Sequence, residues 1–441
     1  MSPQSSRLLD RITSRSATVG VVGLGYVGLP LAVTAAKQGY AVRGFDVDQE
    51  KIDRIAARKS YIGAVEDLDL VRAWEAGRFD ATTDFAAMAA CDAIIICVPT
   101  PLTRHREPDL SFVETTTREI AAHMRDEALV VLESTTYPGT TRDVVKPILE
   151  RSGKSFHVGF SPEREDPGNP NFRTATIPKI VAGEGAEAGT LVRSLYQGIV
   201  DEVVEVADTP TAEAIKITEN IYRSVNIALV NELKMIYDRM GIDVWNVIDG
   251  AATKPFGFQP FYPGPGLGGH CIPIDPFYLS WKTREFGMNT RFIELAGEIN
   301  TSMPHHVVSR AAEALDRARG KGLNGASVLV VGASYKKNVA DVRESPSMRI
   351  MEAFSDRGSS VSFHDPHIPE IPQMRSYPEF VGMSSVSLDG CERYDLIVIA
   401  TDHDIIDYAA LGRAAEDGSV VVDTRNVFAR KGLNPELVTK A

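Results

Sequence analysis

The sequence predicts an α/β protein in which two Rossmann-like, doubly wound domains are joined by a long central helix. Short apolar runs of strand length alternate with helix-compatible stretches near the N-terminus and again near the C-terminus, which is typical of parallel sheets. Between these two sets lies one long run of helix formers. At 441 residues the chain also exceeds what a single hydrophobic core usually serves.

The two sets of apolar runs resemble each other in order. The first consists of Thr18 to Gly23, Ala41 to Asp46, Asp92 to Val98 and Leu129 to Ser134; the second consists of Ser327 to Gly332, Ser360 to His364, Asp395 to Thr401 and Ser419 to Asp423. Each set has a glycine after its first strand and an aspartate at or just after the end of its second. We therefore predict a flexible leader at 1–17, a Rossmann domain at 18–208, a central helical section at 209–310 and a Rossmann-like domain at 311–441.

The central section contains Thr211 to Met240, which is free of proline after Pro210 and is followed by Gly241, a suitable helix stop. Its many apolar positions predict a helix that also supplies a dimer interface. Ile217, Ile221, Val225 and Leu229 are examples of these positions.

Composition excludes several classes of protein. The net charge of -12 argues against general binding to nucleic acid or to anionic lipid. No apolar run approaches the roughly 20 residues of a membrane helix, and the polar start lacks a secretory signal. We therefore expect a cytoplasmic protein. The four cysteines lack metal-ligand spacing, so we expect no metal.

A dinucleotide site is predicted at Gly23-Leu24-Gly25-Tyr26-Val27-Gly28, which follows the first strand and precedes a helix-compatible stretch. The glycines permit a tight turn and close approach of a pyrophosphate, and the helix N-terminus offers N–H groups and partial positive charge. We expect Gly23, Gly25, Tyr26, Val27 and Gly28 to contact the cofactor.

Asp46 ends the second strand, where its carboxylate is placed to accept hydrogen bonds from the ribose hydroxyls of NAD and to repel the extra phosphate of NADP. NAD is therefore preferred, with an ordinary turn aspartate as the alternative, and the nearby Arg43 leaves the choice between NAD and NADP open. Thr100 and Thr135 follow the third and fourth strands at the edge where open sheets bind ligands, although either also suits a plain turn.

The corresponding C-terminal loop, Gly332 to Asn338, keeps only the first glycine and carries lysines instead. A second NAD is therefore not expected there. Lys336 and the later Arg343 have the charge to neutralise a diphosphate, which favours a nucleotide-sugar pocket; the alternative is a solvated basic loop.

Cys271 is the candidate nucleophile because it alone among the cysteines lies in a glycine-lined segment, Gly264 to Asp275. A thiolate can attack an aldehyde to give a thiohemiacetal, which loses hydride to a second NAD and becomes a thioester that water hydrolyses. The alternative is a structural thiol. Adjacent side chains rarely point at each other, so His270 is not expected to pair with Cys271.

Lys216, Asn220 and Arg223 are spaced to share one face of the long helix. Such a stripe usually faces water; if it faces a cleft instead, Lys216 can stabilise an oxyanion, Asn220 can hold the reacting oxygen or a water, and Arg223 can bind substrate. Glu163 is a candidate base for thioester hydrolysis, and Asp275 a candidate to orient the water or Lys216.

Together these residues resemble the UDP-glucose/GDP-mannose dehydrogenase family, from about Val19 to the C-terminus. The matching motifs are the Gly23 fingerprint, Val98-Pro99-Thr100-Pro101, Ser134-Thr135, Pro162-Glu163, Lys216 with Asn220, Gly268-Gly269-His270-Cys271, and Tyr335-Lys336 through Arg343-Glu344-Ser345-Pro346. The resemblance implies that Cys271 is the covalent nucleophile, that Lys216, Asn220, Glu163 and Asp275 assist it, and that the C-terminal domain binds UDP. It further implies that the substrate-binding residues are Arg164, Glu165, Arg223, Gly268, Tyr335, Lys336 and Arg343.

One position departs from the UDP-glucose and GDP-mannose enzymes, which generally carry a lysine where this chain has Ile274. The segment His270 to Pro276, and Arg164 after Glu163, are similar to the UDP-N-acetylhexosamine 6-dehydrogenase branch. Glu133 to Gly139 and Glu163 to Gly168 are most similar to UDP-N-acetylglucosamine enzymes of surface-polysaccharide biosynthesis. The expected activity is oxidation of that sugar at C6 to the carboxylate with NAD.

Three other hypotheses stay open at this point. A dehydrogenase for UDP-glucose, UDP-N-acetylmannosamine or UDP-N-acetylgalactosamine would share the catalytic residues. A noncatalytic nucleotide-sugar sensor would be expected to lose Cys271 or Lys216, and both are present. A two-electron hydroxyacid-type dehydrogenase would need no cysteine.

Overall fold

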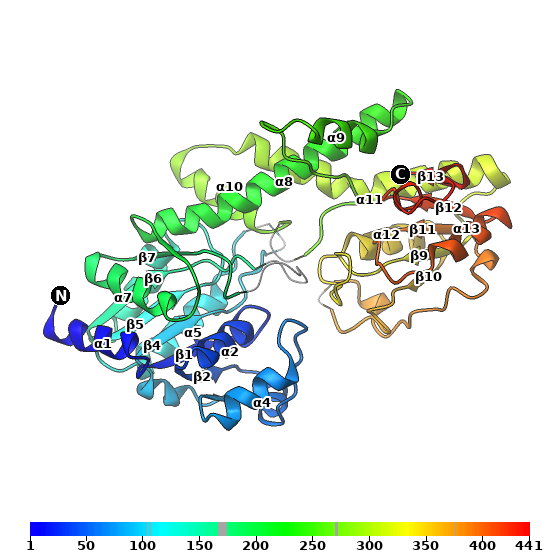
Figure 1. Cartoon of the computed structure of the whole chain (residues 1–441). Coiled ribbons are helices and arrows are strands. Elements are labelled where there is room, and N and C mark those ends of the chain that lie inside the picture. The colour runs from blue at the N-terminus through cyan, green and yellow to red at the C-terminus, as the bar shows by residue number, and fades with distance from the viewer. Residues whose placement is uncertain (104, 106, 166–173, 270–271, 375) are drawn as a thin grey trace. The chain divides into compact units, whose positions relative to one another are not determined.

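A computed structural model describes residues 1–103, 105, 107–165, 174–269, 272–374 and 376–441 (Figure 1). The chain forms two compact units. Unit 1 comprises Met1–Glu219 and Phe277–Asn289, and unit 2 comprises Asn220–Pro276 and Thr290–Ala441. The predicted central section is thus divided between the units, and α8 (Thr209–Arg239) begins in unit 1 and ends in unit 2.

Unit 1 contains an eight-stranded sheet with the strand order β3-β2-β1-β4-β5-β6-β7-β8. Its strands are β1 (Thr18–Val22), β2 (Ala41–Phe45), β3 (Phe79–Thr82), β4 (Ala93–Ile96), β5 (Ala128–Leu132), β6 (Phe156–Phe160), β7 (Lys179–Gly183) and β8 (Val203–Glu205). Only the β6 and β7 pair is antiparallel. The order reverses direction between β1 and β4, and ligands bind at such switch points, outside the carboxyl ends of the strands.

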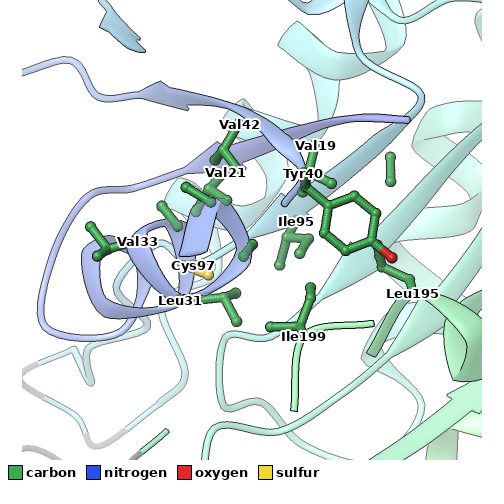
Figure 2. Close-up of a cluster of buried hydrophobic side chains, with 14 of the residues drawn as sticks. Val19, Val21, Leu31, Val33, Tyr40, Val42, Ile95, Cys97, Leu195 and Ile199 are labelled. Atoms are coloured by element: carbon green, nitrogen blue, oxygen red, sulfur yellow. The ribbon is translucent and has the colours of Figure 1, made fainter. Parts of the chain in front are cut away.

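Alternating side chains of these strands supply two separate cores. Ile95 and Val131 face one core, with residues of α2 (Gly28–Lys37) and α7 (Ala186–Gln197). Figure 2 labels Ile95 in this core, together with Leu31 of α2 and Leu195 of α7. Ile94 and Val130 face the other, with residues of α5 (Ser111–His123) and α6 (Lys146–Glu150). Because both faces are covered, the central strands β4 and β5 are apolar throughout, which made them recognisable in the sequence.

The remaining helices of unit 1 connect or border the sheet. They are α3 (Gln49–Ala56), α4 (Asp67–Glu75), the 3-10 helices η1 (Phe85–Ala90) and η3 (Thr283–Phe286), the π-helical turn η2 (Thr141–Val145), and α10 (Asp275–Lys282), whose first residues belong to unit 2.

The expectation of a flexible leader at 1–17 is wrong, because these residues include helix α1 (Pro3–Thr13). Ser2 caps the helix through its side chain, and Pro3 occupies the first turn. Ile12 is fully buried in the core shared with α7, and the Ile12 carbonyl accepts a hydrogen bond of 3.0 Å from the Tyr40 hydroxyl. The helix is short and amphipathic, and it was not predicted because most of its residues are polar.

Unit 2 contains a five-stranded parallel sheet with the order β10-β9-β11-β12-β13. The strands are β9 (Ser327–Val331), β10 (Ser360–His364), β11 (Leu396–Ile399), β12 (Val420–Asp423) and β13 (Val438–Lys440). Helices α11 (Arg291–Arg319) and α12 (Pro346–Ser355) contribute to the core on one face, and α13 (Tyr408–Glu416) and α14 (Val427–Arg430) to the core on the other. Short 3-10 helices occur at Pro378–Phe380, Cys391–Arg393 and Pro435–Leu437.

The long helix matches its prediction to within two residues at its start and one at its end, and α9 (Val244–Ala252) follows it. The apolar positions predicted on this helix include both buried and exposed side chains. Ile217 is only 1% exposed and packs within the chain, whereas Leu229 is 49% exposed. Ile217 is therefore not available to a partner subunit.

The fold class is confirmed: two doubly wound sheets and a long helix that contributes to both units. None of the helices in the described part of the chain is long and apolar enough to span a membrane.

Replacing Ile12 with alanine tests whether α1 is part of the folded core. We expect the free energy of unfolding of unit 1 to fall by about 2–5 kcal/mol, because a fully buried side chain would be truncated. Arg7→Ala, on an exposed position of the same helix, should leave the stability nearly unchanged. Equal denaturant midpoints for Ile12→Ala and the unaltered protein would show that α1 contributes nothing.

Candidate active site

The turn after β1 has the geometry of a phosphate cradle. Gly23 has a φ of +89°, and a Cβ atom there would lie 2.6 Å from the carbonyl oxygen of Cys97. A Cβ on Gly28 would lie 1.9 Å from the Gly23 carbonyl oxygen, whereas a Cβ on Gly25 would meet nothing within 4 Å. Two glycines are thus required by the fold, and the third leaves open space beside the N-terminus of α2, which has no side-chain cap.

Asp46 is 6% exposed and holds this turn. Its carboxylate accepts hydrogen bonds from the backbone N–H of Leu24 at 2.9 Å and of Asp48 at 3.0 Å, and from the Lys51 ammonium at 3.0 Å. A carboxylate has about four acceptor positions, so capacity remains for a ribose hydroxyl. The two readings of Asp46, turn aspartate and ribose ligand, are therefore compatible.

Arg43 is not directed at a cofactor phosphate. Its guanidinium donates to both carboxylate oxygens of Asp80, at 2.7–3.1 Å. Thr100 and Thr135 lie together at the carboxyl ends of β4 and β5, where the Thr100 hydroxyl donates to the Thr135 carbonyl at 2.7 Å. The hydroxyl of Tyr278, on α10, donates to the Thr100 carbonyl.

The predicted base, Glu163, belongs to an ion-pair cluster centred on Lys179. The Lys179 ammonium, at the start of β7, is 2.8 Å from a carboxylate oxygen of Glu163 and 2.8 Å from one of Glu133. Lys179 is 2% exposed and Glu133 is 1% exposed. The Tyr196 hydroxyl donates to Glu133 at 2.8 Å, and the Cys97 thiol lies 3.6 Å from the other Glu133 oxygen. We call these five residues the Lys179 cluster.

The two carboxylates of the cluster differ in how well their charge is stabilised. Burial alone would raise the pKa of Glu163, but Lys179, the N–H of Glu165 and the charge of Lys216 lower it overall. Burial raises the pKa of Glu133, and Lys179 only partly offsets this. Glu163 is thus the better-stabilised anion.

The other predicted residues of unit 1 surround Glu163. Lys216 is 6% exposed, so the polar face of α8 is not a solvated stripe at this point. The N–H groups of Arg164 and Glu165 each donate to one Glu163 oxygen at 2.7 Å. The Arg164 guanidinium donates to the Pro178 carbonyl and to Glu219, both at 2.7 Å.

In unit 2, Asn220 and Asp275 form a buried pair. The Asn220 amide donates to the Asp275 carboxylate, and the Arg223 guanidinium donates to the Asn220 oxygen. Asn220 is fully buried and Asp275 is 3% exposed. The sequence predicted that Asp275 orients the water or Lys216; its contact with Asn220 was not predicted.

Gly268 and Gly269 pack tightly on the loop that follows β9. A Cβ on Gly268 would lie 2.6 Å from the Cβ of Tyr335, and the Gly269 N–H donates to the Arg343 carbonyl at 3.3 Å. The Arg343 guanidinium binds both oxygens of Asp341, at 2.6–3.0 Å. His270 and Cys271 lie outside the described residues.

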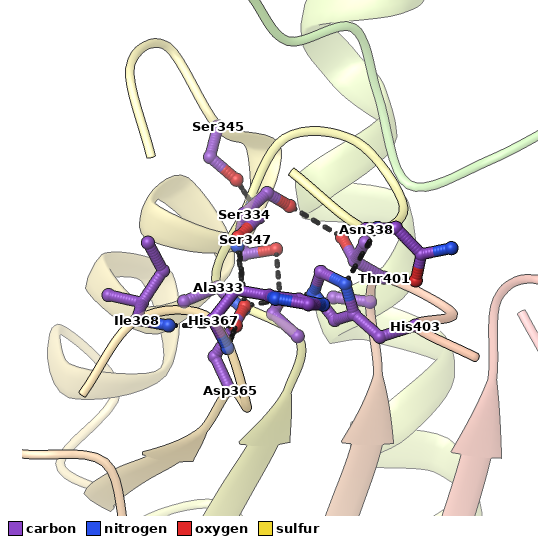
Figure 3. A network of polar contacts seen from close by, with 12 residues as sticks. Ala333, Ser334, Asn338, Ser345, Ser347, Asp365, His367, Ile368, Thr401 and His403 are labelled. Atoms are coloured by element: carbon purple, nitrogen blue, oxygen red, sulfur yellow. Dashed lines mark hydrogen bonds and ion pairs between the residues drawn. The ribbon is translucent and has the colours of Figure 1, made fainter. Parts of the chain in front are cut away.

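The loop with Tyr335 and Lys336 is held by a buried Asp365–His403 pair (Figure 3). Asp365 accepts hydrogen bonds from the N–H groups of Ala333 at 2.7 Å and Ser334 at 2.9 Å. The Asn338 N–H donates to Nδ1 of His403 at 2.9 Å, so Nε2 carries the hydrogen that is donated to Asp365 at 3.0 Å. Burial would raise the pKa of Asp365, but these partners lower it to about 2.

Sequence reasoning did not single out Lys179, Glu133 and His403, which form buried polar contacts beside predicted site residues. A signal was present for the first two. Lys179 is a lone charge opening an apolar strand, and Glu133 is a lone charge directly after Leu132. A charge at the end of a buried strand requires a partner, which the sequence alone does not identify.

No group of three or more His, Cys, Asp or Glu residues suited to a metal ion occurs in residues 1–103, 105, 107–165, 174–269, 272–374 and 376–441.

Family models match most of the chain in three consecutive regions. Residues 17–200 match the NAD binding domain of the UDP-glucose/GDP-mannose dehydrogenase family, residues 210–302 its central domain, and residues 329–430 its UDP binding domain.

Individual relatives cover nearly the whole chain. A UDP-N-acetyl-D-glucosamine 6-dehydrogenase of Pseudomonas aeruginosa is 36% identical over 391 residues, 87% of this chain and 90% of that protein. A UDP-N-acetyl-D-mannosamine dehydrogenase of Methanococcus maripaludis is 34% identical, with 92% of each chain covered. The solved structure of a UDP-D-ManNAc dehydrogenase from Pyrococcus horikoshii has a TM-score of 0.82 at 32% identity, covering 93% of this chain and 96% of that one.

The glycine turn gives a prediction that separates cofactor binding from folding. Gly25→Ala should leave the melting temperature unchanged, because the new Cβ meets no protein atom, but should weaken NAD binding by about tenfold or more, about 1.4 kcal/mol. Gly28→Ala should lower the melting temperature, because its Cβ overlaps the Gly23 carbonyl. Calorimetric NAD titration and thermal unfolding measure both. Unaltered NAD affinity in Gly25→Ala would mean that the cofactor does not occupy this turn.

The family models and the relatives confirm both the expected cofactor and the expected resemblance. The N-terminal region is an NAD binding domain, and the turn after β1 fits that cofactor. The chain belongs to the UDP-glucose/GDP-mannose dehydrogenase family and is an NAD-dependent nucleotide-sugar dehydrogenase.

Proposed function

We propose that the protein oxidises the C6 hydroxyl of UDP-N-acetylglucosamine to the carboxylate, through an aldehyde and a thioester on Cys271. The observation that carries the proposal is the Glu163 carboxylate, which is 12% exposed, lies 2.8 Å from the Lys179 ammonium and is acted on by the charge of Lys216. A general base at this place can take the proton from the water that attacks a thioester. NAD, when bound, accepts a hydride from the reacting carbon in each of the two oxidations.

In the proposed reaction Lys216 stabilises the negative charge that develops on the C6 oxygen, and Glu163 takes the proton from the water that attacks the thioester. Asn220, fixed by Asp275 and Arg223, donates a hydrogen bond to a reacting oxygen or to the water. The water oxygen forms the new bond to carbon, the carbon–sulfur bond breaks, and the uronic acid leaves the Cys271 thiolate.

For the cofactor we propose contacts with Gly23, Gly25, Tyr26, Val27 and Gly28 for the pyrophosphate, and with Asp46, Thr100 and Thr135 for the rest of NAD. The packing of Gly268 against Tyr335 supports a nucleotide-sugar site in unit 2 that includes Lys336 and Arg343. We assign Arg164 and Glu165 to substrate binding as well.

The N-acetylglucosamine part of the proposal is supported by the sequence around Arg164 and Ile274 and by the relative from Pseudomonas aeruginosa. The relative from Methanococcus maripaludis is named for the mannosamine epimer, which makes UDP-N-acetylmannosamine the second candidate.

The stoichiometry of NADH tests this function. Unaltered protein should form two NADH for each UDP-N-acetylglucosamine consumed, with a uronic acid as the product, measured by absorbance and mass spectrometry. Cys271→Ala should form acid at least about a thousandfold more slowly because the nucleophile is lost. Cys391→Ala is the matched control, since Cys391 lies in a core of the second sheet.

One NADH and a stable aldehyde would contradict the thioester route. Turnover of UDP-N-acetylmannosamine or UDP-glucose without turnover of UDP-N-acetylglucosamine would contradict the assigned sugar.

We also propose that the protein is a homodimer built on unit 2. Tyr222, Leu229 and Ile236 recur every seven residues on one face of α8 and are 47%, 49% and 47% exposed. One self-complementary patch suffices for a twofold interface, because each subunit presents the same residues to the other. An apolar stripe of this kind is costly to leave in water.

Leu229→Glu should weaken the dimer at least about tenfold by burying a carboxylate in an apolar interface. Light scattering during size exclusion should then give the mass of one chain at concentrations where the unaltered protein has twice that mass. Leu68→Glu, at an equally exposed leucine of α4, is the control and should stay dimeric. Equal masses for the Leu229 variant and the control would rule out α8 as the interface.

A further inference from the structure

The Lys179 cluster places two carboxylates on one buried ammonium. Glu163 and Glu133 each lie 2.8 Å from the Lys179 nitrogen, and neither Lys179 nor Glu133 has access to bulk water. A single pair would be enough to neutralise Lys179. The second carboxylate is an additional buried charge, and its desolvation lowers the stability of the fold. Its presence at this place therefore points to a function.

The two carboxylates have unequal sets of hydrogen-bond donors. Glu163 accepts from Lys179 and from two backbone N–H groups, those of Arg164 and Glu165. Glu133 accepts from Lys179 and the Tyr196 hydroxyl, with the Cys97 thiol near its second oxygen. Burial with these weaker partners raises the pKa of Glu133, whereas that of Glu163 is lowered. Part of the rise for Glu133 comes from the charge of Glu163 itself, so this part disappears once Glu163 carries a proton and Lys179 is left to Glu133.

A base in this position faces an electrostatic problem. When Glu163 takes a proton from water it stops neutralising Lys179, and a buried ammonium without a counter-ion opposes that proton transfer. If Lys179 had Glu163 as its only partner, the ion pair would also hold the carboxylate too firmly in its basic form to act as an efficient base.

We infer that Lys179 and Glu133 are positioning residues for Glu163: Lys179 orients the Glu163 carboxylate, and Glu133 stays as the counter-ion of Lys179 while Glu163 carries the proton. The inference rests on the proposed role of Glu163 in thioester hydrolysis. No electrons move in this step: the proton passes from water to Glu163 as the carbon–oxygen bond forms and the carbon–sulfur bond breaks.

The charged and titratable groups around Glu163 come from several elements of unit 1. They are Lys179 on β7, Lys216 on α8, Glu133 after β5, Cys97 after β4, Tyr196 on α7, and the neighbouring Arg164 and Glu165, with Glu219 bound to Arg164. Glu133 contacts Lys179, and its charge also repels that of Glu163, so removing Glu133 should lower the pKa of Glu163 through both effects.

Two substitutions should move the pH dependence of hydrolysis in opposite directions. Hydrolysis rises with pH as Glu163 ionises. Glu133→Gln leaves Lys179 to Glu163 alone, so the acidic limb should move to lower pH and the plateau rate should fall by about tenfold, because a more strongly held carboxylate is a weaker base. Lys179→Met removes the stabilising charge, so the acidic limb should move to higher pH by about one unit or more.

The readout is the pH profile of kcat with UDP-N-acetylglucosamine and NAD, together with the NADH burst after rapid mixing. Slowed hydrolysis should let the thioester accumulate, so a burst of NADH should precede the steady state, and the acylated protein should be detected by its mass. The KM values for both substrates should change little. Lys179→Arg, which keeps the charge, should restore the unaltered profile.

Controls separate this inference from loss of folding and from failure of the proposed function. The double variant Glu133→Gln/Lys179→Met keeps the net charge of these three positions at that of the unaltered protein, whereas Lys179→Met alone leaves two carboxylates without the ammonium. It should still show the upward shift if Lys179→Met alone unfolds. Arg193→Met, at an exposed ion pair of α7, should change nothing.

If Glu163→Gln blocks hydrolysis while Glu133→Gln and Lys179→Met leave the limb in place or shift it the same way, the inference is wrong and the function stands. If the unaltered protein forms no uronic acid from any UDP-N-acetylhexosamine, both fail.

Discussion

Both sheets depend on the same contact, in which an aspartate after the second strand binds the backbone of the turn after the first. Asp46 accepts from the N–H of Leu24, and Asp365 accepts from the N–H groups of Ala333 and Ser334. In each case the carboxylate is almost completely buried, so it is costly unless these donors are in place. The contact fixes where the turn can go, and the turn determines which ligand each sheet can hold.

The two turns then diverge in what surrounds them. After β1, Gly25 leaves open space beside an uncapped helix terminus, which suits a pyrophosphate. After β9 the loop instead carries Tyr335 and Lys336, packs against Gly268, and is held at its far side by His403. The same strand and carboxylate device therefore supports a dinucleotide site in one unit and a proposed nucleotide-sugar site in the other.

Local patterns were enough to predict β1, β2, β4, β5 and β9 to β12, the long helix and the glycine turn, but not β3, β6, β7, β8 or β13. Each has a period or a motif of a few residues, and strands covered on both faces are apolar throughout. Helix α1 was missed because its buried positions, such as Leu8 and Ile12, are few among polar residues.

Lys179 was missed for a different reason: its partners Glu133 and Glu163 are distant in the sequence, and only the sheet brings strand ends together. Likewise, the burial of Lys216 and Asn220 depends on what packs over α8, which helical spacing does not reveal.

Because α8 is continuous from unit 1 into unit 2, it tolerates insertions and deletions less well than a loop would. Lys216 belongs to unit 1 and Asn220 to unit 2, and a single helical turn connects them. Inserting or deleting one residue between them would rotate one side chain relative to the other by about 100°, whereas a loop would absorb the change. Insertions should therefore accumulate in the surface connections of either sheet and be excluded from this turn of helix, where each added residue changes the direction of every side chain that follows.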